Sequence, residues 1–253
     1  MGKIVCVTNQ KGGVGKTTTA IQLGRGLMLL NDAKVLFLDM DSQCNMTYVL
    51  GADDSKDNIM TVLMGQCRAA DAIQHVGEID IIASSQDISA MSKYVGGDRK
   101  EYVLREALAP VKNKYDFIVI DSPPALGLTT INILTAADIV VIPASADILS
   151  LQGIGQLYNT IDAVRSYCNP DLRIDGILLT RHNDRLIHSR EIREMIQETA
   201  DQIGTRVYDS KIRESVAIRE ATTSGKSIFD YAPGSRQADD YWGFIAEFLE
   251  KVN

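Results

Sequence analysis

The chain has 253 residues, 45% of them hydrophobic and 23% charged, and a formal net charge of -7 at pH 7. This composition is typical of a folded globular protein and excludes a disordered chain. The net negative charge excludes a molecule that binds nucleic acid over its whole surface, so any such contact requires a local basic patch.

The cysteines give no sign of a disulfide framework or a zinc site, because no C-x-x-C pair occurs. They are Cys6, Cys44, Cys67 and Cys168. This usage favours a reducing, cytosolic compartment. A strand-like run begins at Lys3 in place of a signal peptide, and the apolar stretches are too short to span a bilayer. We therefore expect a soluble intracellular protein.

Short apolar runs rich in Val and Ile alternate with helix-like stretches along the whole chain. Such continuous runs predict strands covered on both faces, as in a parallel sheet. The predicted strands lie at 3–9, 34–41, 79–84, 116–122, 138–145 and 174–180. The predicted helices lie at 16–30, 100–109, 151–167 and 189–202. The alternation predicts an α/β fold, a doubly wound and mostly parallel sheet flanked by helices, in a single domain over residues 1–253.

The first predicted strand leads into the run VTNQKGGVGKTTT, residues 7–19, which is typical of a phosphate-binding loop. Its glycines let the backbone approach phosphate oxygens because no Cβ stands in the way, and the following helix start adds partial positive charge. We expect Lys16 to reach the β- and γ-phosphates and the Thr17 hydroxyl to bind Mg²⁺. The loop residues expected to contact nucleotide are Gly12, Gly13, Val14, Gly15, Lys16, Thr17 and Thr18.

The second predicted strand ends in FLDMDSQCN, residues 37–45, where carboxylates occupy alternate positions. Asp39 and Asp41 therefore point to one side, and at the carboxyl end of a parallel strand they would lie beside the phosphate loop. Two turn-forming aspartates are the alternative. A third carboxylate, Asp121, ends the predicted strand at 116–122, where it is placed to hold Mg²⁺ through water. Pro123 and Pro124 then turn the chain out of the sheet.

The predicted strand at 174–180 is followed by Arg181 and Asn183, at a strand end where nucleotide folds often bind the base. Arg181 could equally belong to a surface face. Positive charge is also concentrated in this part of the chain. Residues 181–236 carry ten Lys and Arg against nine Asp and Glu, a net charge of +1, so the rest of the chain has -8.

The last segment has a helical spacing of apolar residues, at Tyr241, Phe244, Ile245, Phe248, Leu249 and Val252. A membrane-binding helix would need a basic polar face. Here acids at Asp239, Asp240, Glu247 and Glu250 stand against one Lys251. Anionic lipid would repel this helix, so the segment predicts a helix that packs on the core.

The motifs at the four strand ends, in this order, resemble those of the ParA/MinD family of ATPases, the SIMIBI class of P-loop NTPases with a deviant Walker A motif. The loop reads K-G-G-x-G-K-T, with Gln10 where the general pattern has its first glycine, and IDSPPxLG and LLTRxN follow. The resemblance covers nearly the whole chain. It departs from the family at Ser42 and Cys44, where proline and glycine are usual.

This resemblance implies an ATPase with ATP and Mg²⁺ as cofactors. It implies that Lys11 also binds nucleotide, reaching across a dimer interface to the nucleotide of the partner subunit. Asp41 would orient the attacking water, and Asp39 would lie nearer the metal. The implied catalytic residues are Lys11, Lys16 and Asp41, and the implied metal site consists of Thr17, Asp39 and Asp121. Arg181 and Asn183 would lie near the adenine.

Segment 211–236 resembles the C-terminal part of segregation ATPases, whose basic residues touch the DNA backbone. The resemblance therefore implies a ParA-type partitioning ATPase, a homodimer on ATP that binds DNA nonspecifically. A ParB-like centromere-binding partner would stimulate its slow hydrolysis and release it. The protein would be cytoplasmic and associated with the nucleoid. The candidate DNA contacts are Arg213, Arg219, Lys226 and Arg236, and a solvated face of mixed charge is the alternative.

Three other functions compete with this interpretation. A MinD-like positioning ATPase would bind membrane through its last helix, which the acids disfavour. An electron-transfer ATPase like the nitrogenase iron protein would need two cysteines per subunit around a cluster, and none of the four lies in the expected segments. A repressor would need an N-terminal helix-turn-helix module, and we expect none because the first strand begins at Lys3.

Overall fold

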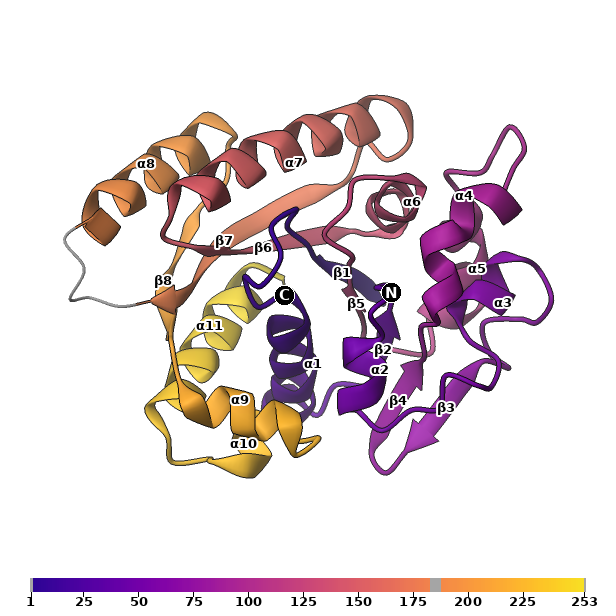
Figure 1. Ribbon diagram of the computed structural model, residues 1–253, viewed down its shortest axis with the longest axis horizontal. Helices are drawn as coiled ribbons and strands as arrows, with labels where there is room; N and C mark the ends of the chain where they lie inside the picture. The colour runs from indigo at the N-terminus through magenta and orange to yellow at the C-terminus, as the bar shows by residue number, and fades with distance from the viewer. Residues whose placement is uncertain (1, 183–187, 253) are drawn as a thin grey trace.

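One sheet of eight strands runs through the centre of the structure, a computed structural model that describes residues 2–182 and 188–252 (Figure 1). Its strand order is β3-β4-β2-β5-β1-β6-β7-β8. The strands are β1 (Lys3–Val7), β2 (Val35–Asp39), β3 (Ile73–Val76), β4 (Ile79–Ile82), β5 (Phe117–Asp121), β6 (Ile139–Ser145), β7 (Arg173–His182) and β8 (Val207–Arg213).

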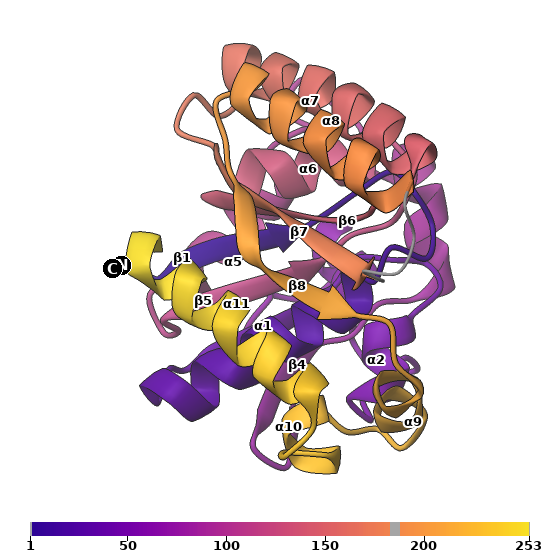
Figure 2. The ribbon, with the colours of Figure 1, turned by 90° about the vertical axis from the view of Figure 1, so that its left-hand side faces the viewer.

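Helices connect these strands and cover both faces of the sheet. They are α1 (Lys16–Asn31), α2 (Asn45–Val49), α3 (Ile59–Leu63), α4 (Met91–Tyr94), α5 (Val103–Lys112), α6 (Leu128–Ala136), α7 (Ile148–Tyr167), α8 (His188–Gln202), α9 (Val216–Thr223), α10 (Ile228–Tyr231) and α11 (Arg236–Val252). A short 3₁₀ helix spans Gln86–Ala90. Seen from the side, α7 and α8 lie on one face of the sheet and α1 and α11 on the other (Figure 2).

All neighbouring strands pair in parallel except β3 and β4, which form an antiparallel hairpin at one edge. The predicted doubly wound, mostly parallel sheet is thus confirmed. The six predicted strands are present, but β3 and β8 were missed. Both lie at sheet edges and expose part of their length. Such strands lack the continuous apolar run by which buried strands are recognised.

The central strands contribute side chains to a hydrophobic core on each face of the sheet, which explains their unbroken apolar runs. In β1, Ile4 and Cys6 pack with α5, α6 and α7, whereas Val5 and Val7 pack with α1 and α11. Successive side chains of a strand point to opposite faces, so a strand covered on both sides needs apolar residues at every position.

The last helix, α11, packs on the core as predicted. Its residues Tyr241, Phe244, Ile245 and Phe248 are buried against α1 and the sheet. One of its acids also closes the sheet edge, because the Glu247 carboxylate accepts hydrogen bonds from the backbone N–H groups of two β8 residues at 2.9 and 2.8 Å. Among the described residues there is no helix with the length and apolarity needed to cross a membrane.

Candidate active site

The register of the sheet brings the predicted phosphate-side residues together. Strand β5 lies between β1 and β2, and Asp121 is paired in register with both Val7 and Asp39. The loop that follows Val7 therefore begins beside two carboxylates, although 82 residues separate Asp39 from Asp121. This position is the carboxyl edge of a parallel sheet, where nucleotide-binding folds place their ligands.

The glycine-rich loop has the backbone shape that a phosphate cradle requires. Gly13 and Gly15 have φ angles of 76° and 84°, a left-handed conformation that glycine adopts without strain. A Cβ added to Gly12 or Gly15 would meet no atom within 4 Å, so the space over the loop is open. Gly15 directly precedes α1, and no side chain caps that helix start, so its first backbone N–H groups are available to a phosphate.

Lys16 is the first residue of α1 and is 7% exposed. Its Nζ donates a hydrogen bond to the Lys11 carbonyl oxygen at 3.2 Å and so closes the loop on itself. Burial lowers the pKa of Lys16, and the negative charges of Asp121 and Asp41 partly offset this effect. The ammonium group thus lies between the phosphate cradle and the carboxylates.

Asp121 fits a cation site. It is fully buried, and neither of its carboxylate oxygens has a hydrogen-bond partner. Burial, followed by the charge of Asp39, raises its pKa well above the ordinary 3.8, and the nearby Thr17 hydroxyl lowers it without reaching hydrogen-bond geometry. A buried carboxylate without partners has a large desolvation penalty that a bound cation would remove.

Mg²⁺ prefers oxygen ligands, and the Thr17 hydroxyl and the Asp121 carboxylate would hold the ion. Within the described part of the chain, no group of three or more His, Cys, Asp or Glu side chains could hold a metal unaided. Mg²⁺ usually keeps several waters and binds through one or two carboxylates with substrate phosphates, so a site of this kind is consistent with that finding.

Asp39 is bound differently from Asp121, although the two are neighbours in the sheet. Its Oδ1 accepts from the Asp41 backbone N–H at 3.0 Å, and its Oδ2 accepts from the backbone N–H and hydroxyl of Thr47, both at 2.8 Å. Burial raises the pKa of Asp39 to about 6. Both oxygens thus accept hydrogen bonds that hold the loop, and the role of Asp39 at the metal stays a prediction.

Lys11 does not lie free on its loop. Its Nζ pairs with the Asp147 carboxylate at 2.5 Å, and the other oxygen of Asp147 accepts from the Ser150 backbone N–H as the cap of α7. Burial raises the pKa of Asp147, but the hydrogen bond from Lys11 helps to hold it below its ordinary value. Sequence reasoning missed Asp147. Its place before a predicted helix indicates a cap, but not contact with Lys11.

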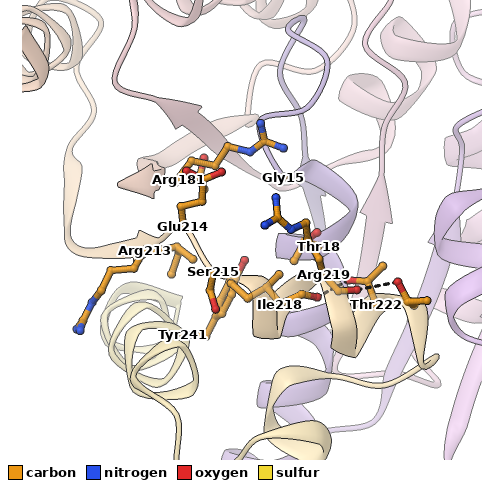
Figure 3. Close-up of a pocket in the computed structure, with 13 residues that line it drawn as sticks. Gly15, Thr18, Arg181, Arg213, Glu214, Ser215, Ile218, Arg219, Thr222 and Tyr241 are labelled. Carbon is orange, nitrogen blue, oxygen red and sulfur yellow. Dashed lines mark hydrogen bonds between the residues drawn. The ribbon is translucent and has the colours of Figure 1, made fainter. Parts of the chain in front are cut away.

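A pocket of about 390 Å³ adjoins the loop on the side of β7, β8 and α9 (Figure 3). Gly15 and Thr18 line it at the loop, with Ile212, Ile218 and Tyr241 as its apolar wall. Its other lining residues include Thr180, Arg181, Arg213, Glu214, Ser215 and Arg219. A partly apolar pocket beside a phosphate loop is suited to the base and sugar of a nucleotide.

Arg181 lines this pocket but also approaches the phosphate loop. Its two terminal guanidinium nitrogens lie 3.9 Å from the position that a Cβ on Gly13 would take, and its side chain points toward the loop in Figure 3. Its φ of 52° is unusual for a residue with a side chain. Thr180 anchors this strand end by donating a hydrogen bond to the Val14 carbonyl at 2.9 Å. Asn183 lies outside the described residues.

The four candidate DNA contacts fall into different environments. Arg213 pairs with Asp240 at 2.7 Å and turns away from the pocket, whereas Arg219 points toward Thr18 (Figure 3). Lys226 and Arg236 are exposed and form no ion pair within the described part of the chain. Arg219 is also exposed and has no ion pair among the described residues, so Arg213 is the one candidate of the four whose charge is neutralised there.

The fold and this site define a P-loop nucleoside-triphosphatase. The sequence matches the family described as an AAA domain over residues 2–174. It is 40% identical to the sporulation initiation inhibitor protein Soj of Bacillus subtilis, over 98% of each chain. It is 35% identical to the chromosome partitioning protein ParA of Myxococcus xanthus, over 99% of this chain and 89% of that one.

Two solved structures share the fold over nearly their full lengths. One is cobyrinic acid a,c-diamide synthase from Mycobacterium smegmatis with bound ADP and magnesium, at 31% identity and a TM-score of 0.84, covering 99% of this chain and 95% of that chain. The other is a plasmid partition protein from Borrelia burgdorferi bound to AMPPNP, at 26% identity and a TM-score of 0.84, covering 100% of both chains. The chain belongs to the family of ParA and Soj partitioning ATPases.

Proposed function

We propose that this chain is a Mg²⁺-dependent partitioning ATPase that dimerises on ATP, binds DNA without reading its sequence, and is released when a partner stimulates hydrolysis. The observation that carries the ATPase part of the proposal is the buried, unpartnered Asp121 carboxylate beside Lys16 and an open glycine loop. The DNA-binding and partner-stimulated parts rest on membership of the partitioning family. The ADP, magnesium and AMPPNP bound to the two structural relatives support it.

Different residues of this chain carry out different parts of the reaction. Lys16 and the N–H groups of the loop stabilise the negative charge that develops on the phosphates. Asp41 orients the attacking water through its free carboxylate oxygen, because its Oδ1 already accepts from the Gln43 backbone N–H at 3.0 Å. Mg²⁺ neutralises phosphate charge when it is bound at Thr17 and Asp121. Arg181 supports the nucleotide from the side of β7.

The face that contains the phosphate loop is suited to a second copy of the chain. Leu126, Ile148 and Leu149 are exposed large apolar residues that follow β5 and β6, the two neighbours of β1 in the sheet. They therefore flank the loop at the same edge. Lys11, which belongs to this face, would leave Asp147 and contribute its charge to the partner's nucleotide when two ATP-loaded subunits meet.

We further propose that DNA binding associates the protein with the nucleoid. We also propose that its partner is a ParB-like protein. Contacts by Lys226 and Arg236 to phosphates would be weak in one subunit and stronger in a dimer that pairs two patches. Arg213 is the weaker candidate because Asp240 neutralises its charge, and Arg219 because its side chain is turned toward Thr18 and the pocket.

Replacing Asp121 with asparagine is expected to raise the melting temperature at pH 7 in the absence of Mg²⁺. The raised pKa means that the folded state holds a proton more tightly than the unfolded chain, so the contribution of Asp121 to stability falls as pH rises above 3.8. Asparagine removes this penalty. Each kcal/mol gained in the free energy of unfolding raises the melting temperature by roughly 2–4 °C in a chain of this size. The gain should shrink toward pH 4. A lower melting temperature at pH 7, or unchanged activation of turnover by Mg²⁺, would contradict the assignment.

The combined change of Lys226→Ala and Arg236→Ala is expected to weaken ATP-dependent retention on DNA of unrelated sequences. The slope of log affinity against log salt should fall by about 0.9 for each phosphate that the variant no longer neutralises. Co-sedimentation with ATP, ADP and no nucleotide measures both quantities. The matched control is Lys93→Ala with Arg105→Ala, two exposed cations on α4 and α5. Retention on DNA that does not depend on salt concentration would refute the DNA proposal, as would ATP-dependent binding to anionic liposomes in place of DNA.

A further inference from the structure

A chain of buried hydrogen bonds connects the Asp41 segment to strand β4 through Thr47, a residue that no motif singled out. Thr47 lies in the short helix α2 and is 2% exposed. It donates twice to Asp39 Oδ2, at 2.8 Å from its backbone N–H and at 2.8 Å from its hydroxyl. Its hydroxyl oxygen in turn accepts from the Ser84 backbone N–H at 2.9 Å. One side chain thus joins the ends of β2 and β4.

The other oxygen of Asp39 connects this series of hydrogen bonds to Asp41, the residue proposed to orient the attacking water. Asp39 Oδ1 accepts from the Asp41 backbone N–H at 3.0 Å. Beyond that point the loop is bound to itself, because Gln43 N–H donates to Asp41 Oδ1 at 3.0 Å and Cys44 N–H donates to the Asp41 carbonyl at 2.9 Å. The sheet itself holds the chain as far as Met40, whose backbone N–H donates to the Asp121 carbonyl at 3.0 Å, and the Asp39 carboxylate holds the next backbone N–H, that of Asp41.

Nothing in this chain of hydrogen bonds touches the nucleotide cradle. The loop that contains Lys16 is closed by its own carbonyl contact, and the pocket is lined from β7, β8 and α9. A change at Thr47 should therefore move the water-orienting carboxylate and leave the phosphate and base sites in place. A displacement of about 1 Å in a catalytic group lowers rates by about a hundredfold.

We propose that Thr47 is a positioning residue for ATP hydrolysis, which holds the Asp39 carboxylate and through it the backbone of Asp41. The inference rests on the proposed ATPase function. It also gives Asp39 a role, as the link between Thr47 and Asp41 in this series of hydrogen bonds. The hydrogen bond that the hydroxyl accepts from Ser84 fixes its orientation, so that its single proton is directed to Asp39.

The test compares Thr47→Val, which replaces the hydroxyl with a methyl group, with Thr47→Ser, which keeps the hydroxyl. Thr47→Val is expected to lower kcat by about tenfold to a hundredfold, the effect of losing a hydrogen bond to a charged group. The KM for ATP and the Kd of a fluorescent ATP analogue should remain within about twofold of the wild type, since neither Lys16 nor the pocket is touched. Thr47→Ser should restore kcat.

A matched control separates positioning from general damage. Thr61 in α3 also has a hydroxyl that forms hydrogen bonds with the Asn58 backbone, at 2.8 and 3.0 Å, and it lies 3.3 Å from Cys67 Sγ. Thr61→Val should lower the melting temperature without changing kcat. In an Asp41→Ala background, Thr47→Val should cause no further loss of turnover, because its effect passes through Asp41.

The possible failures can be told apart. An unchanged kcat in Thr47→Val, beside an active wild type, would overturn the inference and leave the proposed function standing. An equal loss of ATP affinity and kcat, or no rescue by serine, would show a purely structural role and overturn it as well. A wild-type chain without ATP turnover would overturn the proposed function and this inference with it.

Discussion

Replacement of Lys16 with alanine is expected to abolish ATP binding, with at least about a hundredfold loss of affinity, since a charged contact of this kind contributes several kcal/mol in a buried site. The ammonium group is buried at the start of α1 and lies between the glycine loop and the carboxylates. The other lysine of the loop, Lys11, does not replace it there, because it is paired with Asp147. Titration of a fluorescent ATP analogue measures the loss.

A control is needed because Lys16 also offsets the charge of Asp121 and Asp41 in the folded chain. Thermal melting of Lys16→Ala without nucleotide shows whether the variant folds, and Lys34→Ala, which removes an exposed lysine, is the matched substitution. If folded Lys16→Ala bound ATP within about threefold of the wild type, the phosphate-binding role of this lysine would be wrong.

Replacement of Asp41 with alanine is expected to leave ATP binding and dimerisation intact while turnover falls by at least about a hundredfold, within the range for loss of a group that handles the attacking water. Asp41 is bound to the loop through one oxygen only, and its other oxygen has no hydrogen bond within the described part of the chain. The nucleotide cradle lies on β1 and α1 and does not include it. Single-turnover hydrolysis, together with size-exclusion chromatography in ATP, measures both properties.

The two substitutions should therefore give opposite profiles. Lys16→Ala loses the nucleotide and hence every ATP-dependent state, whereas Asp41→Ala should accumulate the ATP dimer because that dimer is no longer consumed. Asp98→Ala, which removes an exposed acid near α5, is the control for charge alone. Normal turnover in Asp41→Ala would contradict the assigned role, and loss of ATP binding would show that Asp41 supports the cradle.

Sequence reasoning predicted the elements whose signal is local. The runs that form β1, β2 and β5 are apolar at nearly every position because both faces of these strands are covered, and this pattern can be read without knowing the neighbours. The strands β3 and β8 lie at edges and expose part of their length, so their composition resembles that of a loop. The helix α11 was predicted to pack on the core because its acids excluded the alternative, and it does.

The residues of the candidate site fall into the same two groups, those predicted from local sequence and those whose partners lie far away in the chain. The glycine loop, Lys16 and Thr17 occur within a few residues, and the chemistry of phosphate binding requires that order. The partners of these residues lie far away in the chain: Asp147 is 136 residues from Lys11, and Ser84 is 37 residues from Thr47. Arg213, predicted as a DNA contact, lies 27 residues from the Asp240 that neutralises it.

The sequence by itself determined the phosphate loop, the aspartates at the strand ends and the parallel sheet, because these depend on backbone conformation and on burial along short segments. Only the tertiary structure decided that Lys11 is paired with Asp147, that Asp39 is held by Thr47, and that Asp121 is left without a partner. The strength of such interactions depends on the distance and burial of two side chains, and the folded sheet sets both.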